Sequence, residues 1–349
     1  MGKSIMFAAG VLAAGALTAC NSNSGKVQEE ILSIEPTRII FETDMGNDVD
    51  DALAMDMLFK YIDSEKIDLL GISTNKRDDG SLEYIDALTT WYGYPDIPLG
   101  YVKNGVDSRG GENYAYKAMQ VKDKNGNPAF AESHSSDGFA IPSVELYRRL
   151  LSEQPDSSVT VVSVGFSTNL AALLDSKSDS ISPLTGSELV GKKVKSLVVM
   201  AGNIINPQHS EFNVNRDIPA AQKVFGEWPN EIIVSPWELG EEIKYPASSI
   251  ENDFNWTEIH PVVEGYKAFM PMPYDRQTWD LTAVLYAVEG PEGYFTVSEP
   301  GTITVNDNGG TIWTDDPNGR MHYLKCDKQQ QDNILKHFIG LITSKPKNK

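Results

Sequence analysis

Cysteine and basic residues are both scarce in this chain of 349 residues. It has only two cysteines, Cys20 and Cys326, so the chain cannot belong to the class of small secreted proteins held together by several disulfides. Its stability must therefore come from a hydrophobic core. Lysine and arginine number 30 against 49 acidic residues, which gives a formal net charge of −19. Because this charge repels phosphate, it argues against nucleic acid or an anionic membrane as a partner. A small ligand without phosphate escapes that objection.

Long apolar runs are missing except at the N-terminus, where Lys3 precedes an apolar stretch that ends in small residues before Cys20. This stretch is too short and too rich in small residues to favour a transmembrane helix, and it predicts a secretory signal. Leu17-Thr18-Ala19-Cys20 resembles a bacterial lipobox, which implies that Cys20 becomes the lipidated first residue. A plain signal peptide with a chance cysteine is the alternative.

Three regions follow from this pattern: a lipoprotein signal peptide over residues 1–20, a polar tether over 21–35 and one domain over 36–349. No internal repeat, charge run or Pro/Gly-rich linker divides the third region, and its length is at the upper end for a single domain. We therefore expect an exported protein that contacts a bacterial membrane only through its lipid anchor, facing the periplasm or the cell surface. The sequence leaves a monomer and a homo-oligomer open.

Strand-like apolar runs alternate with segments of helical periodicity along this domain. Alternation of this kind predicts an α/β domain with a mainly parallel, Rossmann-like sheet and helices on both faces. Strands are expected at residues 38–41, 67–73, 97–101, 159–164 and 195–201. Helices are expected at residues 49–61, 84–92, 143–152, 170–174, 219–225, 281–288 and 333–342, with a β-hairpin at 301–313.

Acidic residues gather where the first strand gives way to the first helix. The five carboxylates there are Glu42, Asp44, Asp48, Asp50 and Asp51. Ligands of open α/β sheets bind at this edge, and so many like charges repel unless a cation or a helix dipole offsets them. Helix capping explains one such Asp, but not five together with Gly46, which permits close approach of the backbone to a ligand. A hard divalent cation is the simplest interpretation.

Two other acidic-loop chemistries fit poorly. An EF-hand would need its bidentate Glu where Met55 stands. A phosphatase that forms an aspartyl-phosphate would need an Asp where Glu42 stands.

Polar residues also follow the other expected strands. Such loops can converge on one pocket, although each residue alone is more often a turn residue than a ligand. These residues are Asn75, Asp78 and Asp79 after the second strand, Thr168 and Asn169 after strand 159–164, and Asn203, Asn206, Glu211 and Asn213 after strand 195–201.

The acidic loop resembles the signature of the inosine-uridine-preferring nucleoside hydrolase family, Asp-x-Asp-x-Gly followed by Asp-Asp-Ala. The matching residues are Glu42-Thr43-Asp44-Met45-Gly46 and then Asp50-Asp51-Ala52. Two departures are visible, because Glu42 replaces the first Asp and the loop is about two residues longer, holding Asn47 and Asp48. The resemblance implies the nucleoside hydrolase fold and a calcium-dependent enzyme that splits ribonucleosides into base and ribose.

Further segments carry the resemblance and imply roles for single residues. The implied Ca²⁺ ligands are Asp44, Asp51, Asp280 and the backbone carbonyl of Thr168, with Asp44 also the catalytic base. The implied substrate contacts are Asp50, Glu211, Asn213, one of Asn203 and Asn206, Trp279, and His134 near a mobile loop.

Trp279 stands before Asp280 where a pyrimidine-tolerant branch of the family has His. A Trp at this place implies stacking on a purine, so a side-chain proton donor would come from elsewhere, with Asp78 or Asp79 nearest by topology. Two other functions fit the same pocket: a non-catalytic exported receptor for a nucleoside or another polyol, and a hydrolase of some other ribosylated compound.

Overall fold

Alternate residues of the central strands pack on opposite faces of the sheet, as extended backbone requires. In β1 (Thr37–Thr43), Ile39 and Phe41 join one hydrophobic core and Ile40 joins the other. The computed structural model describes residues 35–76, 80–106, 113–133 and 140–349, and residues 36–349 form one unit. The predicted residues Cys20, Asp78, Asp79 and His134 lie outside the described residues.

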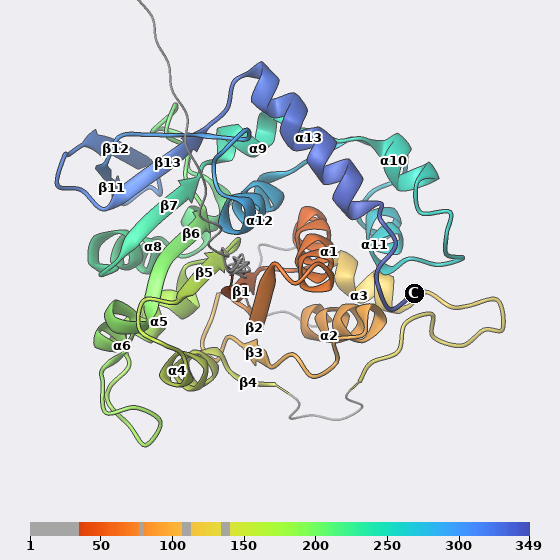
Figure 1. Cartoon of the computed structure of the whole chain (residues 1–349), viewed down its shortest axis with the longest axis horizontal. Helices are drawn as coiled ribbons and strands as arrows, with labels where there is room; N and C mark the ends of the chain where they lie inside the picture. The colour runs from red at the N-terminus through yellow and green to blue at the C-terminus, as the bar shows by residue number, and fades with distance from the viewer. Residues whose placement is uncertain (1–34, 77–79, 107–112, 134–139) are drawn as a thin grey trace, which may run out of the picture. The chain divides into compact units, whose positions relative to one another are not determined.

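The sheet is mixed but mostly parallel, which confirms the predicted α/β class (Figure 1). Among the described residues it has eleven strands in the order β12-β11-β13-β7-β6-β5-β1-β2-β3-β4, with β10 paired to β13. Neighbours from β13 to β4 are parallel, and β10, β11 and β12 are antiparallel. The bounds are β2 (Ile67–Thr74), β3 (Leu99–Tyr101), β4 (Ile141–Pro142), β5 (Val159–Ser163), β6 (Val194–Met200), β7 (Glu231–Ser235), β10 (Thr296–Val297), β11 (Gly301–Val305), β12 (Thr311–Asp315) and β13 (Met321–Lys325).

Helices cover both faces of the sheet, each over its own core (Figure 1). One core takes residues from α1 (Asp50–Asp63), α2 (Ser81–Tyr92), α12 (Trp279–Glu289) and α13 (Lys328–Ile342). The other takes residues from α4 (Ser143–Glu153), α5 (Thr168–Asp175), α6 (Gly186–Lys193) and α8 (Ile218–Glu227). In the part of the chain that the structure describes, no helix combines the length and apolarity needed to cross a bilayer.

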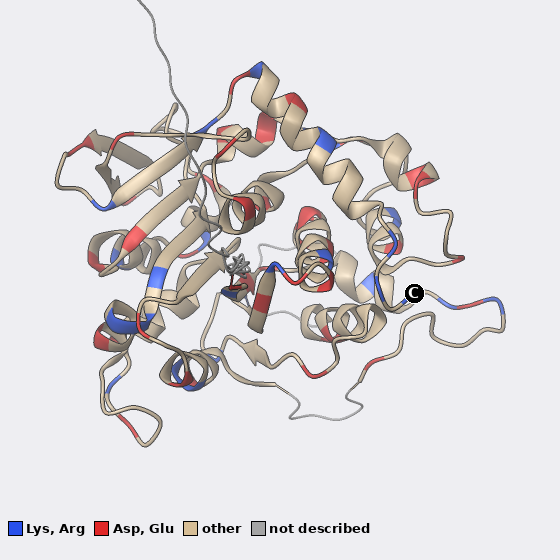
Figure 2. Ribbon diagram, in the orientation of Figure 1, with Lys and Arg blue, Asp and Glu red and all other residues tan. Residues whose placement is uncertain are grey.

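Shorter elements complete the unit. The helices are α3 (Tyr114–Met119), α7 (Phe212–Arg216), α9 (Trp237–Glu242), α10 (Ala247–Asn252) and α11 (Pro261–Phe269). A separate antiparallel pair joins β8 (Lys244–Tyr245) to β9 (Arg276–Gln277). Basic and acidic positions are spread over helices, strands and loops alike (Figure 2).

The turn after β1 carries the acidic loop into α1. Gly46 has a φ of 103°, in the left-handed region that favours glycine. A Cβ atom at Gly46 would lie 2.3 Å from Oδ1 of Asn113, so the missing side chain makes room for Asn113. The sequence interpretation assigned this room to a ligand. Gly46 instead lets the loop pack against α3 and hold its acidic residues at the sheet edge.

Candidate active site

A cavity of about 350 Å³ opens at the carboxyl edge of the sheet. Its lining is acidic in one part and aromatic in another, as a ligand with both a polyol and a planar ring would require. The acidic residues are Asp44, Asp48, Asp50, Glu211 and Asp280; the aromatic ones are Phe212, Trp237, Phe269 and Trp279; the others are Asn47, Val164, Met200, Asn213 and Arg276.

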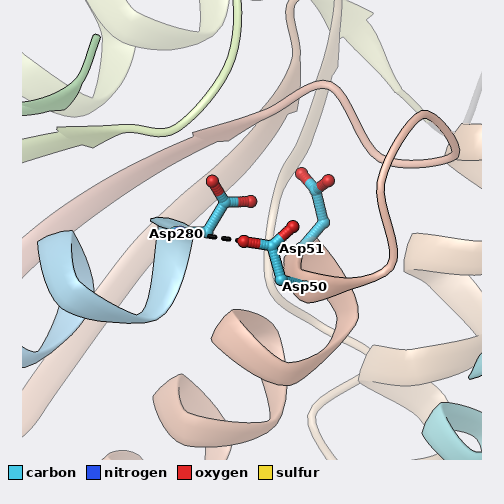
Figure 3. A group of neighbouring side chains, drawn as sticks. All are labelled: Asp50, Asp51 and Asp280. Atoms are coloured by element: carbon cyan, nitrogen blue, oxygen red, sulfur yellow. Dashed lines mark hydrogen bonds between the residues drawn. The ribbon is translucent and has the colours of Figure 1, made fainter. Parts of the chain in front are cut away.

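Three buried carboxylates form the acidic triad of this site: Asp50, Asp51 and Asp280 (Figure 3). One oxygen from each lies within 4.8 Å of the others. Asp50 and Asp51 occupy the first turn of α1, and Asp280 occupies the first turn of α12. The two helices therefore direct their N-terminal ends, and three carboxylates, at one point.

Burial and mutual repulsion oppose ionisation of this acidic triad. Desolvation raises the pKa of Asp50, Asp51 and Asp280 well above the usual range, and neighbouring carboxylates raise it further. Thr43 partly offsets this by donating its hydroxyl hydrogen bond to Oδ1 of Asp51. The donors are all oxygen, so the triad fits a hard divalent cation whose charge would remove the repulsion. The sequence predicted Asp51 and Asp280 as metal ligands together with Asp44; the group of three that the structure brings within 4.8 Å contains Asp50 and not Asp44.

Asp44 lies at the end of β1 and lines the same cavity. Burial raises the pKa of its carboxyl to about 6, although the positive charge of Lys76 and a hydrogen bond from Asn47 lower it. Lys76 is itself buried and donates to Oδ1 of Asn47 at 3.1 Å. Asn47 therefore links the carboxylate to a buried cation and fixes its orientation.

Glu42 is the residue that departs from the family signature, and it does not line the cavity. Its carboxylate accepts hydrogen bonds from the Tyr147 hydroxyl at 2.5 Å and from the Ser163 hydroxyl at 3.1 Å. Full burial raises the pKa of Glu42 to about 7. The glutamate at this position therefore links β1 to β5 and α4 by hydrogen bonds.

Glu211 and Asn213 bring polar groups to the cavity from the start of α7, as the sequence predicted for the pocket. Glu211 accepts backbone hydrogen bonds from Gly202 at 3.0 Å, Asn213 at 2.8 Å and Val214 at 3.1 Å. Burial raises the pKa of Glu211 to about 6 despite these bonds. Nδ2 of Asn213 donates to the Val164 carbonyl at 3.0 Å, which leaves its own carbonyl oxygen for a ligand.

Three predicted residues lie elsewhere. Asn203 is buried and its Oδ1 accepts the Asn206 N–H at 2.7 Å, while Asn206 is exposed; neither lines the cavity. Thr168 lines a separate hollow of about 170 Å³ and donates to Asp217 at 2.6 Å. Because Thr168 opens α5, its carbonyl points along the helix toward the residue four positions on. The residue of this segment that lines the cavity is Val164, whose carbonyl accepts a hydrogen bond from Nδ2 of Asn213.

Asn75 at the end of β2 is a polar strand-end residue to which sequence analysis assigned no role. It is fully buried, and neither atom of its amide has a hydrogen-bond partner among the described residues. A Cβ at Gly165 would lie 2.4 Å from Oδ1 of Asn75 and 2.8 Å from the Asp44 backbone nitrogen, so Asn75 neighbours Asp44. An unpaired buried amide is costly, and in a site it points to a ligand or a water.

Trp279 and Trp237 form the aromatic part of the cavity. Their rings are 6.4 Å apart and inclined by 27°, and Nε1 of Trp279 donates to the Trp237 carbonyl at 2.9 Å. Trp279 is therefore fixed in orientation, with its ring exposed in part to the cavity.

The fold and the cavity together define an α/β protein that binds its ligand at the carboxyl edge of a parallel sheet, over a cluster of carboxylates suited to a metal ion. The family model for inosine-uridine preferring nucleoside hydrolases matches residues 39–336, and the chain belongs to that family. By this membership the protein is an N-ribohydrolase, an enzyme that hydrolyses the bond between ribose and a base.

Solved structures share the fold at low sequence identity. A plant nucleoside hydrolase, the PpNRh1 enzyme, has a TM-score of 0.66 at 17% identity, with 89% of this chain and 100% of that chain covered. An inosine-uridine preferring nucleoside hydrolase from Bacillus anthracis has a TM-score of 0.64 at 17% identity, covering 88% and 99%. A purine-preferring ribonucleoside hydrolase from Gardnerella vaginalis has a TM-score of 0.65 at 17% identity, covering 88% and 98%. No curated protein matches the sequence.

Proposed function

We propose that this enzyme is a Ca²⁺-dependent hydrolase of purine ribonucleosides that releases the free base and ribose. The observation that carries the proposal is that Asp50 and Asp280, two members of the buried acidic triad, line the same cavity as Trp279. A cation with carboxylates suits the sugar and the attacking water, and an indole suits a flat base.

The cation would be held by Asp44, Asp51 and Asp280, with a backbone oxygen completing the protein ligands. Val164 is the better source of that oxygen than Thr168, because Val164 lines the cavity. Ca²⁺ takes six to eight oxygen ligands in flexible geometry, which an all-oxygen set of this kind supports. When bound it would orient a water and lower the cost of removing the water's proton.

Asp44 is the proposed base that takes the proton from the attacking water. Asn75 neighbours the backbone of Asp44 but does not line the cavity, so its unpaired amide is not assigned a role in this step. One oxygen of Asp50 accepts the Asp280 N–H, and the other is available to a ribose hydroxyl.

Asp50, Glu211 and Asn213 would hold the ribose hydroxyls. The bond from C1′ to the base breaks through a cationic, oxocarbenium-like sugar, which nearby carboxylates stabilise. Because three backbone N–H groups fix Glu211, a sugar that lacks the matching hydroxyl leaves a buried acceptor unpaired and becomes a poor substrate.

The purine preference rests on Trp279, which offers a π-face and no proton. Stacking a base on an aromatic side chain contributes on the order of 1–3 kcal/mol. The printed name of the Gardnerella vaginalis relative, a purine-preferring ribonucleoside hydrolase, supports the same preference.

Product analysis with inosine, adenosine, uridine and p-nitrophenyl riboside tests this function. We expect ribose and free base in equal amounts from the purine ribosides, less from uridine, and much slower turnover by Asp44→Asn. p-Nitrophenyl riboside separates the enzyme from a non-catalytic receptor, because its leaving group needs no protonation. Tight inosine binding without turnover of either inosine or p-nitrophenyl riboside would establish the receptor and refute the hydrolase.

We also propose that the enzyme is exported and anchored through a lipid on Cys20, with residues 21–35 as a tether. The support is the sequence pattern before Cys20. Fractionation of cells that express the full chain and Cys20→Ser is the test. Wild-type protein should sediment with membranes, and equal release of both forms into the soluble fraction would contradict the anchor.

A further inference from the structure

Arg276 lies in β9 and lines the cavity, and its guanidinium is bound along one edge by Asp48. Nε donates to Oδ1 of Asp48 at 2.8 Å, and Nη2 donates to Oδ2. Asp48 comes from the two-residue extension of the acidic loop, so this pair belongs to the part of the sequence that departs from the family signature. Paired hydrogen bonds of this kind fix the plane of the guanidinium as well as its position.

Two aromatic rings hold the same guanidinium. Its central carbon lies 5.2 Å from the ring centre of Trp279 and 5.0 Å from that of Phe269. The guanidinium of an arginine is attracted to the partial negative charge on the face of an aromatic ring. Arg276 is therefore fixed by Asp48 on one edge and by two cavity-lining rings.

The other edge of the guanidinium is available. Arginine has five N–H donors, and Asp48 uses one from Nε and one from Nη2. A second parallel pair, one N–H from each terminal nitrogen, has no hydrogen-bond acceptor among the described residues. Arg276 is also the only basic residue among the described residues that line the cavity.

We propose that Arg276 determines base specificity by donating this second pair of N–H groups to the edge of a base that lies beside it in the cavity. The inference rests on the proposed function and specifies its substrate class. A 6-oxopurine presents two neighbouring acceptors, O6 and N7, that match two parallel donors. A 6-aminopurine presents N7 beside a donating amino group, which opposes one of the two N–H groups. The cavity therefore selects inosine and guanosine over adenosine, by roughly 10- to 100-fold in kcat/KM.

Asp48 acts as a positioning residue in this account. Without its carboxylate the guanidinium keeps its charge and its aromatic contacts but loses the hydrogen bonds that set its angle. Asp48→Asn should therefore reduce the preference for inosine over adenosine while Arg276 remains in place. Lysine at position 276 keeps a positive charge but cannot present two parallel donors, so Arg276→Lys should not restore the preference.

The test compares kcat/KM for inosine and adenosine in wild type, Arg276→Gln, Arg276→Lys and Asp48→Asn. Arg149→Gln is the matched control, because Arg149 is exposed on α4 and its guanidinium pairs with Glu145 at 2.7 Å. Binding of free hypoxanthine and adenine, followed by quenching of tryptophan fluorescence, gives a second readout that needs no turnover. Thermal unfolding of each variant shows whether the fold is kept.

Wild type and Arg149→Gln should prefer inosine and bind hypoxanthine more tightly than adenine, and Arg276→Gln should bring both ratios close to one. Unchanged ratios in a folded Arg276→Gln would overturn the inference, as would a wild type that favours adenosine. If Arg276→Gln does not fold, an unchanged ratio in Asp48→Asn overturns it in the same way. Selective hypoxanthine binding without hydrolysis would contradict the proposed function and leave the specificity role supported.

Discussion

The backbone N–H of Asp280 donates a hydrogen bond of 3.0 Å to Oδ2 of Asp50, and this joins the first turns of α12 and α1 (Figure 3). The two residues are 230 positions apart in the chain. The bond places the Asp280 carboxylate beside those of Asp50 and Asp51 and directs two helix N-terminal ends at them. The partial positive charge of each helix end offsets part of the repulsion among three carboxylates, and a cation would offset the rest.

Asp51→Asn and Asp280→Asn should abolish Ca²⁺ binding, because each removes one charge from the acidic triad. In wild type, Ca²⁺ in large excess over its dissociation constant should raise the melting temperature, since it binds only the folded state. Isothermal titration and thermal unfolding measure the two effects. Asp332→Asn is the control, because Asp332 is exposed and pairs with Lys328, away from the cavity. An equal rise of melting temperature in all variants would place the cation elsewhere.

Asp44→Asn should lower kcat by roughly 10²- to 10⁴-fold, the usual contribution of a positioned base. Asn213→Ala should act mainly on KM, with an increase of about 10-fold for the loss of one hydrogen bond to ribose. Steady-state kinetics with inosine separates these effects. A near-normal kcat for folded Asp44→Asn would show that another group is the base.

In the metal-free protein, the free energy of unfolding should depend on pH through Glu42. Its pKa is about 7 in the folded protein against a usual 4.5, because it is buried. The folded state therefore keeps a proton that the unfolded chain releases, so the free energy of unfolding falls as pH rises from about 4.5 to about 7. Above that range the effect is complete, and its size is on the order of 3 kcal/mol.

Glu42→Gln isolates this effect, because glutamine still accepts hydrogen bonds from Tyr147 and Ser163 but does not titrate. Urea unfolding of the chelated proteins at a series of pH values gives the comparison. The variant should lose less stability than wild type between pH 5 and pH 7. Parallel curves for the two proteins would mean that Glu42 is ionised throughout in the folded state.

Trp279→Ala should lower kcat/KM for inosine by roughly 10- to 100-fold through loss of stacking, and should change turnover of p-nitrophenyl riboside little. Trp313→Ala on β12 is the control for a tryptophan outside the cavity. Equal losses on both substrates would assign Trp279 to support of the fold. A wild-type enzyme that prefers uridine would contradict the proposal that Trp279 favours purine ribosides by stacking.

The local sequence pattern predicted the central strands of the sheet correctly, but it missed strands toward the antiparallel end of the sheet. β1, β5 and β6 are buried on both faces and are written as apolar runs, so their positions were predictable. β13 was not predicted, because its sequence, MHYLK, mixes polar and apolar residues and only Met321 and Leu324 are fully buried. β7 was also missed, since its apolar run has only three residues.

The site was predictable where its residues are close in sequence or follow the family signature. Asp44, Asp50 and Asp51 lie close together in sequence, at the turn after β1 and the start of α1, and Asp280 was predicted through the family resemblance. The pair of Asp48 with Arg276 joins residues 228 positions apart, so no local pattern predicts it. Val164 and Thr168 are only four positions apart in the chain, yet they line different hollows. Only the three-dimensional structure shows that Val164, and not Thr168, lines the cavity.

Release of hypoxanthine from inosine by chelator-treated enzyme, measured during titration with Ca²⁺ and in parallel with Mg²⁺, shows whether hydrolysis depends on calcium. The account predicts no release without metal and recovery that follows Ca²⁺ occupancy, with weaker recovery in Mg²⁺ because Mg²⁺ demands stricter octahedral geometry. Full release in the presence of chelator, or none from protein loaded with Ca²⁺, would contradict it.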